Sequence, residues 1–137
     1  DIYIREGCNN CHSQIVRPLP FETVRYGPPS TLEESAIDRP HLWGSKRTGP
    51  DLARVGKKYP AAWHYLHMKS PQSMYPQSNM PAYAWLADAK LDRNDAEKKM
   101  MVLGYPYTSD DIRMLEGKTE MDALVAYLVR LGKELQQ

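Results

Sequence analysis

The stretch Cys8-Asn9-Asn10-Cys11-His12 decides the fold of this chain, because it fits one kind of cofactor attachment. A Cys-x-x-Cys-His sequence is the attachment motif for c-type haem. Its two thiols form thioethers with the vinyl groups of the porphyrin, and the adjacent imidazole becomes the proximal ligand of the iron. We therefore predict one covalent haem c, bound through Cys8 and Cys11 and ligated by His12.

Three other interpretations of the two cysteines are weaker. A thioredoxin-like redox pair would follow a strand in a βαβ pattern, which the flanking residues do not show. A structural zinc site needs four ligands, and the remaining histidines form no second ligand pair. A disulfide between Cys8 and Cys11 would close too short a loop to stabilise the fold much.

The composition indicates one small domain, which we expect to be a single cytochrome c domain over residues 1–137. The formal net charge is +1, without the long basic run of a nucleic-acid binder. No stretch approaches the ~20 consecutive apolar residues that cross a bilayer, so we expect a mature or trimmed soluble domain. Because covalent haem attachment takes place on the oxidising outer side of bacterial membranes, we expect a periplasmic location.

Hydrophobic spacing predicts a mostly α-helical fold with no strand. The clearest helix is the last, which begins after an N-cap at Thr119 and runs to Leu135, with Gly132 as a weak point or a place of close packing. Other helices are expected over residues 2–7, 60–69, 94–103 and 109–117. Long loops, over residues 17–50 and 70–92, are unusual in a small domain unless a buried group such as a porphyrin organises them.

Seven methionines and three further histidines compete for the distal side of the iron. Met80 lies in an irregular segment directly before Pro81, which would fix the turn that presents the sulfur. Met74, in the same loop, is the second choice, and a methionine is otherwise most often a core residue. His64 and His67 keep a bis-histidine alternative open. A haem iron with both axial positions filled favours electron transfer, because no substrate reaches the metal.

Further residues are candidates for the haem environment. The carbonyl of Pro50 is a candidate acceptor for the Nδ1–H of His12, which would fix the tautomer of the ring. Arg47 and Arg54 lie beside this turn and could bind the haem propionates, although a solvated basic loop fits them equally well. Aromatic candidates for the pocket wall, or for an ordinary core, are Trp43, Tyr59, Trp63, Tyr83 and Trp85.

Five segments of the chain follow one another in a pattern that is found in one family. They are Asp1–Gly7, Cys8–His12, Gly44–Gly56, Met80–Tyr83 and Gly117–Leu128, and they extend over nearly the whole chain. Together they resemble the monohaem cytochrome c subunit of cbb3-type cytochrome c oxidases (CcoO, also called FixO). The third segment, GSKRTGPDLARVG, is far more specific than the haem motif, which every c-type cytochrome carries.

This resemblance implies an all-α, class I cytochrome c-like fold, with long ordered loops around a covalently bound haem. Its first and last helices would cross near the haem edge, with Gly7 and Tyr127 at the crossing. The implied axial ligands are His12 and Met80. The implied role is electron transfer, with no enzyme activity of its own, in an oxygen-reducing and proton-pumping oxidase. The implied partners are a dihaem cytochrome c subunit and the haem–copper catalytic subunit, at the periplasmic side of the bacterial inner membrane.

The family anchors this domain with an N-terminal transmembrane helix that is absent from the sequence, and we expect a chain trimmed just after that helix rather than a soluble homologue. Two other functions stay open. One is a free soluble periplasmic cytochrome c that shuttles electrons, and the other is a haem enzyme or sensor with an open iron site. Diffusible carriers usually show a charge bias for steering, so the near-neutral balance favours the integrated subunit.

Overall fold

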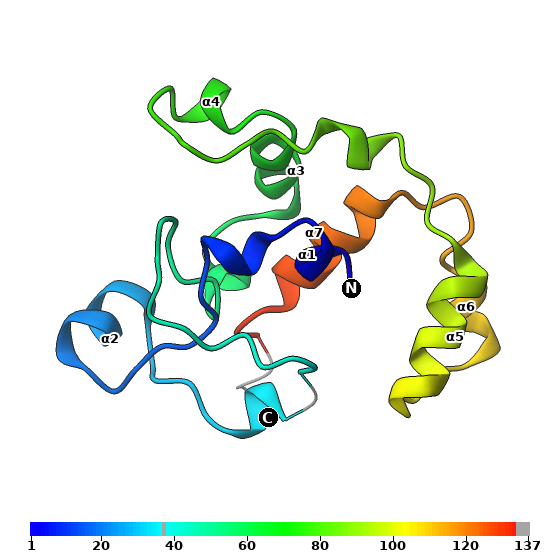
Figure 1. The fold of residues 1–137 in the computed structure, drawn as a ribbon, viewed down its shortest axis with the longest axis horizontal. Coiled ribbons are helices and arrows are strands. Elements are labelled where there is room, and N and C mark those ends of the chain that lie inside the picture. Colours follow the sequence, from blue (N-terminus) through cyan, green and yellow to red (C-terminus); the bar gives the residue numbers. More distant parts are fainter. Residues whose placement is uncertain (37, 134–137) are drawn as a thin grey trace. The chain divides into compact units, whose positions relative to one another are not determined.

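A computed structural model describes residues 1–36 and 38–133 of the chain, which fall into two compact units. Of the described residues, the first unit contains 1–36, 38–64 and 125–133, and the second contains 65–124. Helices, turns and loops make up the described residues, which hold no strand (Figure 1). Among these residues, one isolated antiparallel bridge joins Lys90 and Thr119. The prediction of an all-α fold is confirmed. Across this described part, no helix has both the length and the apolar character needed to cross a membrane.

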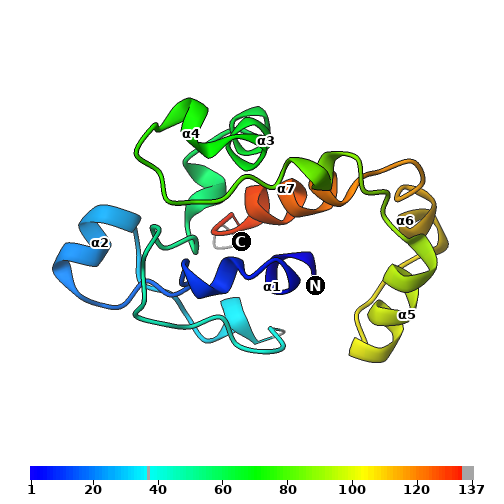
Figure 2. The same ribbon diagram turned by 45° about the horizontal axis from the view of Figure 1, so that its top comes forward.

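The first and last helices contact each other within the first unit. The helices that begin in this unit are α1 (Ile2–Arg5), η1 (Cys8–Asn10), α2 (Pro20–Tyr26), η2 (Glu33–Ser35), η3 (Val55–Lys57) and α3 (Ala61–Lys69), and the C-terminal part of α7 (Glu120–Arg130) joins them. The rings of Tyr3 in α1 and Tyr127 in α7 have centroids 5.5 Å apart, and the ribbon views show these two helices next to each other (Figures 1 and 2). The Gln14 amide and the Tyr127 hydroxyl exchange hydrogen bonds of 2.9 and 3.0 Å, which tie the segment after the haem motif to α7.

The second unit holds short helices with clear capping signals. They are α4 (Pro71–Met74), η4 (Ala84–Ala87), α5 (Arg93–Leu103) and α6 (Ser109–Arg113). Helix α5 ends at Gly104, whose φ of 66° is left-handed, so the prediction for residues 94–103 is confirmed within one residue. Thr108 and Asp111 form a capping box at the start of α6, but this helix ends four residues before the predicted position because the chain turns towards Gly117. Helices α5 and α6 lie side by side (Figure 2).

Helix α7 begins where the sequence predicts and ends earlier. The Thr119 amide donates to the Asp122 carboxylate at 2.9 Å, and the Asp122 amide donates to the Thr119 hydroxyl at 3.1 Å. The helix stops at Arg130, so Gly132 follows it rather than lying inside it, and Leu135 lies outside the described residues. Gly132 has a φ of 77°, a conformation that a helix interior does not allow.

Glycines allow the chain to approach the end of α7 closely. A Cβ at Gly56 would lie 2.3 Å from the carbonyl oxygen of Val129, and a Cβ at Gly132 would lie 2.8 Å from that of Ala53. Close packing at Gly132, one of the two predicted roles, is thus confirmed. Gly7 is different, because a Cβ there would meet the side chain of Asn10. Its predicted place at the helix crossing is wrong, and its φ of 75° instead forms the left-handed turn between α1 and η1.

The Gly56→Ala substitution is expected to lower the free energy of unfolding by roughly 1–3 kcal/mol, because the new methyl group would collide with backbone that cannot move aside alone. Urea denaturation of the haem-loaded protein measures this change. Gly44→Ala is the matched control, since its Cβ would meet only Ser13 at 4.0 Å. Equal losses in the two variants would contradict the close approach at Gly56.

Helices α2 and α4 lie in regions where no helix was predicted. Each has a proline at its first turn, which fixes a helical φ at little cost. Helix α2 also inverts the usual pattern: Phe21 and Val24 are 66% and 87% exposed, whereas Glu22 is 0% exposed. Hydrophobic spacing could not reveal a helix whose buried residue is a charged one.

Candidate haem-attachment site

The Cys-x-x-Cys-His motif forms one tight turn that begins with η1, after α1 and the turn at Gly7. The amides of Cys11 and His12 both donate to the carbonyl of Cys8, at 3.2 and 2.9 Å. Cys8 is partly buried and Cys11 is exposed, and both are free thiols, as thioether formation requires. Burial raises the pKa of the Cys8 thiol to about 11, so this thiol stays protonated at neutral pH.

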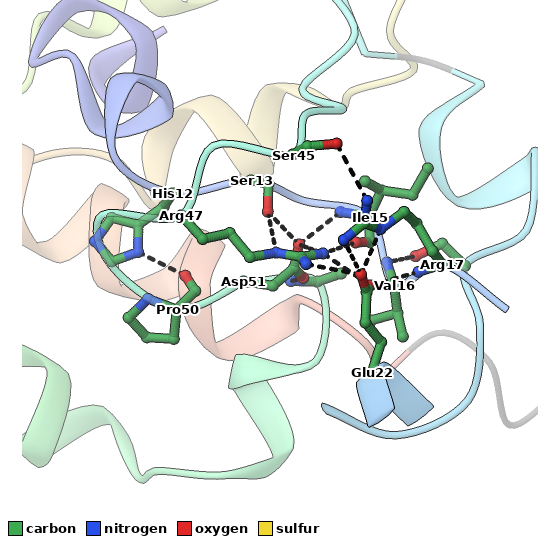
Figure 3. A network of polar contacts seen from close by, with 12 residues as sticks. His12, Ser13, Ile15, Val16, Arg17, Glu22, Ser45, Arg47, Pro50 and Asp51 are labelled. Atoms are coloured by element: carbon green, nitrogen blue, oxygen red, sulfur yellow. Dashed lines mark hydrogen bonds and ion pairs between the residues drawn. The ribbon is translucent and has the colours of Figure 1, made fainter. Parts of the chain in front are cut away.

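One hydrogen bond orients the imidazole of His12. Its Nδ1–H donates to the carbonyl oxygen of Pro50 over 2.7 Å, as the sequence predicts (Figure 3). This bond fixes the tautomer in which Nε2 carries the lone pair that binds a metal. The backbone passes close to the ring, because a Cβ at Gly49 would lie 2.2 Å from Cε1 of His12. The free thiols and the oriented imidazole fit a c-type haem.

Arg47 lies at the centre of a polar network beside this histidine (Figure 3). Its Nε donates to the Ser13 hydroxyl at 2.9 Å, and its Nη2 donates to the Ile15 carbonyl at 2.8 Å. The same guanidinium binds both carboxylate oxygens of Glu22 at 2.9 Å and reaches Asp51 at 3.4 Å. Arg47 therefore joins the segment after His12, helix α2 and the loop that carries Pro50.

The two carboxylates of this network are buried and well paired. Asp51 accepts hydrogen bonds from the Ser13 hydroxyl at 2.6 Å and from the Ile15 amide at 2.9 Å. Glu22 forms an ion pair with Arg17 as well as with Arg47. The hydrogen bonds from Arg47, and then those from Arg17, outweigh the effect of burial and lower the pKa of Glu22 to about 2.

Glu22 is expected to make stability fall as the pH drops from about 4.3, the ordinary value for an unfolded glutamate, towards 2. In that range the unfolded state binds a proton at this position and the folded state does not, so stability rises with pH. The urea midpoint of the haem-loaded protein, measured between pH 2 and 6, should depend less on pH in the Glu22→Gln variant. Identical slopes for the two proteins would contradict this assignment.

Arg54 makes a second buried ion pair in the first unit. Its two terminal nitrogens bind the Glu34 carboxylate at 2.7 and 3.0 Å, and they also donate to the carbonyls of Ala53 and Pro29. Its Nε donates to the Pro28 carbonyl at 3.1 Å. Like Arg47, this arginine is directed at protein acceptors rather than at solvent. Propionate binding by Arg47 and Arg54 stays a prediction.

The loop of the predicted distal ligand lies in the second unit and is held by its own hydrogen bonds. The side-chain amide of Gln72 donates to the carbonyls of Met80 and Ser78, at 2.6 and 3.1 Å. The amide of Met80 donates to the Ser78 hydroxyl at 3.2 Å, and the amide of Tyr83 donates to the Met68 carbonyl at 2.8 Å. These bonds fix the backbone on both sides of Met80. Iron ligation by Met80 stays a prediction.

The predicted aromatic residues occur in separate clusters. Trp63 stacks on Tyr59 with centroids 3.8 Å apart, and the ring of the buried His64 lies edge-on to Trp63 at 5.3 Å, all within the first unit. Tyr83 lies 5.3 Å from Trp85 in the second unit. A role of Trp63 and Tyr83 in lining the haem pocket stays a prediction.

The helical fold and the oriented Cys-x-x-Cys-His motif define a cytochrome c-like protein. The family model described as "Cytochrome C oxidase, mono-heme subunit/FixO" matches residues 1–118, and the chain belongs to this family. A search of curated proteins finds no match. Membership makes the chain a mono-haem electron-transfer subunit of a membrane-bound cytochrome c oxidase complex, as the sequence resemblance implied.

Proposed function

We propose that residues 1–137 act as one cytochrome c domain that transfers electrons through a six-coordinate haem c. In this proposal the haem is attached through Cys8 and Cys11 and ligated by His12 and Met80. The domain passes electrons from the dihaem cytochrome c subunit to the haem–copper catalytic subunit, at the periplasmic side of the bacterial inner membrane. The hydrogen bond from His12 to Pro50 carries the proposal, because it prepares the imidazole of the attachment motif for an iron.

The two proposed ligands act on the iron in opposite directions. Bound haem supplies the one-electron couple between ferric and ferrous iron. Donation from His12 to the Pro50 carbonyl makes the imidazole more basic, which favours the ferric state. The thioether of Met80 favours the ferrous state and raises the potential, as suits a carrier that feeds a terminal acceptor. Together the two side chains would occupy both axial positions and exclude substrates from the metal.

Local structure around Met80 supports its role as a fixed ligand. The bonds from Gln72 to the carbonyls of Ser78 and Met80 hold the backbone of the loop, and Pro81 limits rotation directly after the ligand. A ligand whose backbone is already fixed moves little when the iron changes its charge. Small movement is what electron transfer at a haem requires.

Carbon monoxide titration of the ferrous protein tests this proposal. We expect little or no binding at neutral pH on the timescale of mixing, because Met80 would have to leave the iron first. Rapid and complete binding would contradict six-coordinate electron transfer and would favour an enzyme or sensor with an open site.

A further inference from the structure

We propose that Glu22, Arg47 and Asp51 form a positioning cluster that holds the Pro50 carbonyl against the imidazole of His12 and thereby sets the electronic state of the haem. This inference rests on the proposed haem ligation by His12. None of the three side chains would touch the iron. They would act through the two backbone segments that carry the histidine and the proline.

The connectivity of the cluster supports this role. Ser13 directly follows His12, Asp51 directly follows Pro50, and a hydrogen bond of 2.6 Å joins their side chains. The Leu52 amide donates to the Ser13 carbonyl at 2.9 Å, beside the same pair. On the other side, the Gly49 amide donates to the carbonyl of Cys11, the residue before His12, at 2.9 Å. The bond from His12 to Pro50 is thus enclosed by hydrogen bonds between the same two segments.

The charges of the cluster make its geometry specific. The side chains of Glu22 and Asp51 are fully buried, and Arg47, whose side chain is 14% exposed, lies between them. A buried charge that loses its counter-charge is strongly unfavourable. Moving any of these three side chains away from its partners would create such a charge, so the arrangement resists small displacements. The planar guanidinium of Arg47 also fixes the orientation of its partners, because its hydrogen bonds point in set directions. It donates to Ser13 and Ile15 as well as to the two carboxylates.

Helix α2 owes its orientation to the same cluster. Glu22 points inward and binds the guanidinium of Arg47 through both of its oxygens, while the ring of Tyr26 lies 5.2 Å from the Arg47 guanidinium carbon. Phe21 and Val24 are left exposed on the outer side of the helix. A short helix that buries its acid and exposes its apolar residues indicates that the ion pair, and not hydrophobic burial, holds it in place.

The pair of Arg54 and Glu34 offers a matched control. It is also a bidentate ion pair in the first unit, and the partners of Arg54 are Glu34 and the carbonyls of Pro28, Pro29 and Ala53. Glu34, Pro28 and Pro29 lie outside the two segments that carry His12 and Pro50, and only the bond to the Ala53 carbonyl falls within the segment after Pro50. Loss of the Glu34 charge should therefore cost stability without changing the orientation of His12.

Glu22→Gln and Glu34→Gln in the haem-loaded protein provide the test. We expect both variants to lower the urea midpoint. Only Glu22→Gln should raise the reduction potential, because a weaker hydrogen bond from His12 to Pro50 makes the imidazole less basic. Only this variant should also change the pattern of haem methyl shifts in the ferric NMR spectrum. That pattern reports the orientation of the axial ligands, which a loss of stability alone does not move.

Unchanged potential and methyl shifts in Glu22→Gln, or equal changes in both variants, would overturn the positioning cluster. If Glu22→Gln does not fold, Arg47→Lys is compared with Glu34→Gln by the same readouts. Lysine keeps the positive charge but cannot bind both oxygens of Glu22 through a planar guanidinium. Wild-type protein without covalent haem would overturn the proposed function itself. If the wild-type protein carries covalent haem but Glu22→Gln changes neither the reduction potential nor the methyl shifts, only this inference is overturned.

Discussion

The Met80→Ala variant should keep its haem covalently attached and lose its high reduction potential. We expect a drop of about 0.1–0.3 V, a moderate share of the roughly 0.8 V that axial ligands span. The reason is that the thioether stabilises ferrous iron, and alanine leaves the position to water or to a stronger donor. Equilibrium redox titration measures the potential, and ferrous carbon monoxide binding should become fast in the same variant.

Met74→Ala is the control for this prediction, because Met74 lies in the neighbouring helix α4 and was the second choice as ligand. Its potential and its carbon monoxide binding should match those of the wild type. A reversed result, with Met74→Ala changed and Met80→Ala unchanged, would transfer the ligand to Met74. If neither variant differed from the wild type, the distal ligand would be another residue, and the buried His64 would be examined next.

Replacing Cys8 and Cys11 together by serine should abolish covalent haem retention. Acid–acetone extraction should leave the haem on the wild-type polypeptide and remove it completely from the double variant. Each single variant should retain haem through its one remaining thioether, at a lower yield. Haem that resists extraction from the double variant would contradict attachment through this motif.

The sequence predicted the parts of this fold that depend on local rules. The N-cap at Thr119 and the left-handed stop at Gly104 lie where the residue types require them. The hydrogen bond between His12 and Pro50 was also predicted, although it joins residues 38 positions apart. It could be predicted because a proximal histidine in a c-type site needs an acceptor and the Gly-Pro-Asp turn provides one.

The remaining features depend on tertiary contacts that a linear pattern does not record. Helix α2 was missed because its inward residue is Glu22, which becomes favourable only when Arg47 is present 25 residues further along. The sequence pattern places Gly7 at a helix crossing, whereas the close approaches to the end of α7 occur at Gly56 and Gly132. A glycine in the sequence indicates either a close contact or a positive φ at that position. Only the fold shows which of the two applies and which neighbour lies close.

The positioning cluster was missed for a related reason. Arg47 stands in a basic stretch whose pattern predicts a propionate partner or a solvated residue, but its acceptors come from three separate segments. One signal was present in the sequence. Ser13 directly follows the haem motif and Asp51 directly follows the proline that binds the histidine, so both polar residues were adjacent to the predicted hydrogen bond.

Co-purification with oxidase activity shows whether this chain works as a subunit of an oxidase. Native membranes are solubilised gently and fractionated, and the haem-stained polypeptide is compared with oxygen consumption in every fraction. We expect the two to migrate together as one large complex, with the polypeptide carrying a single covalent haem. A haem-stained polypeptide that appears alone in the soluble fraction, with oxygen consumption elsewhere, would contradict a role as an oxidase subunit and would indicate a mobile electron shuttle.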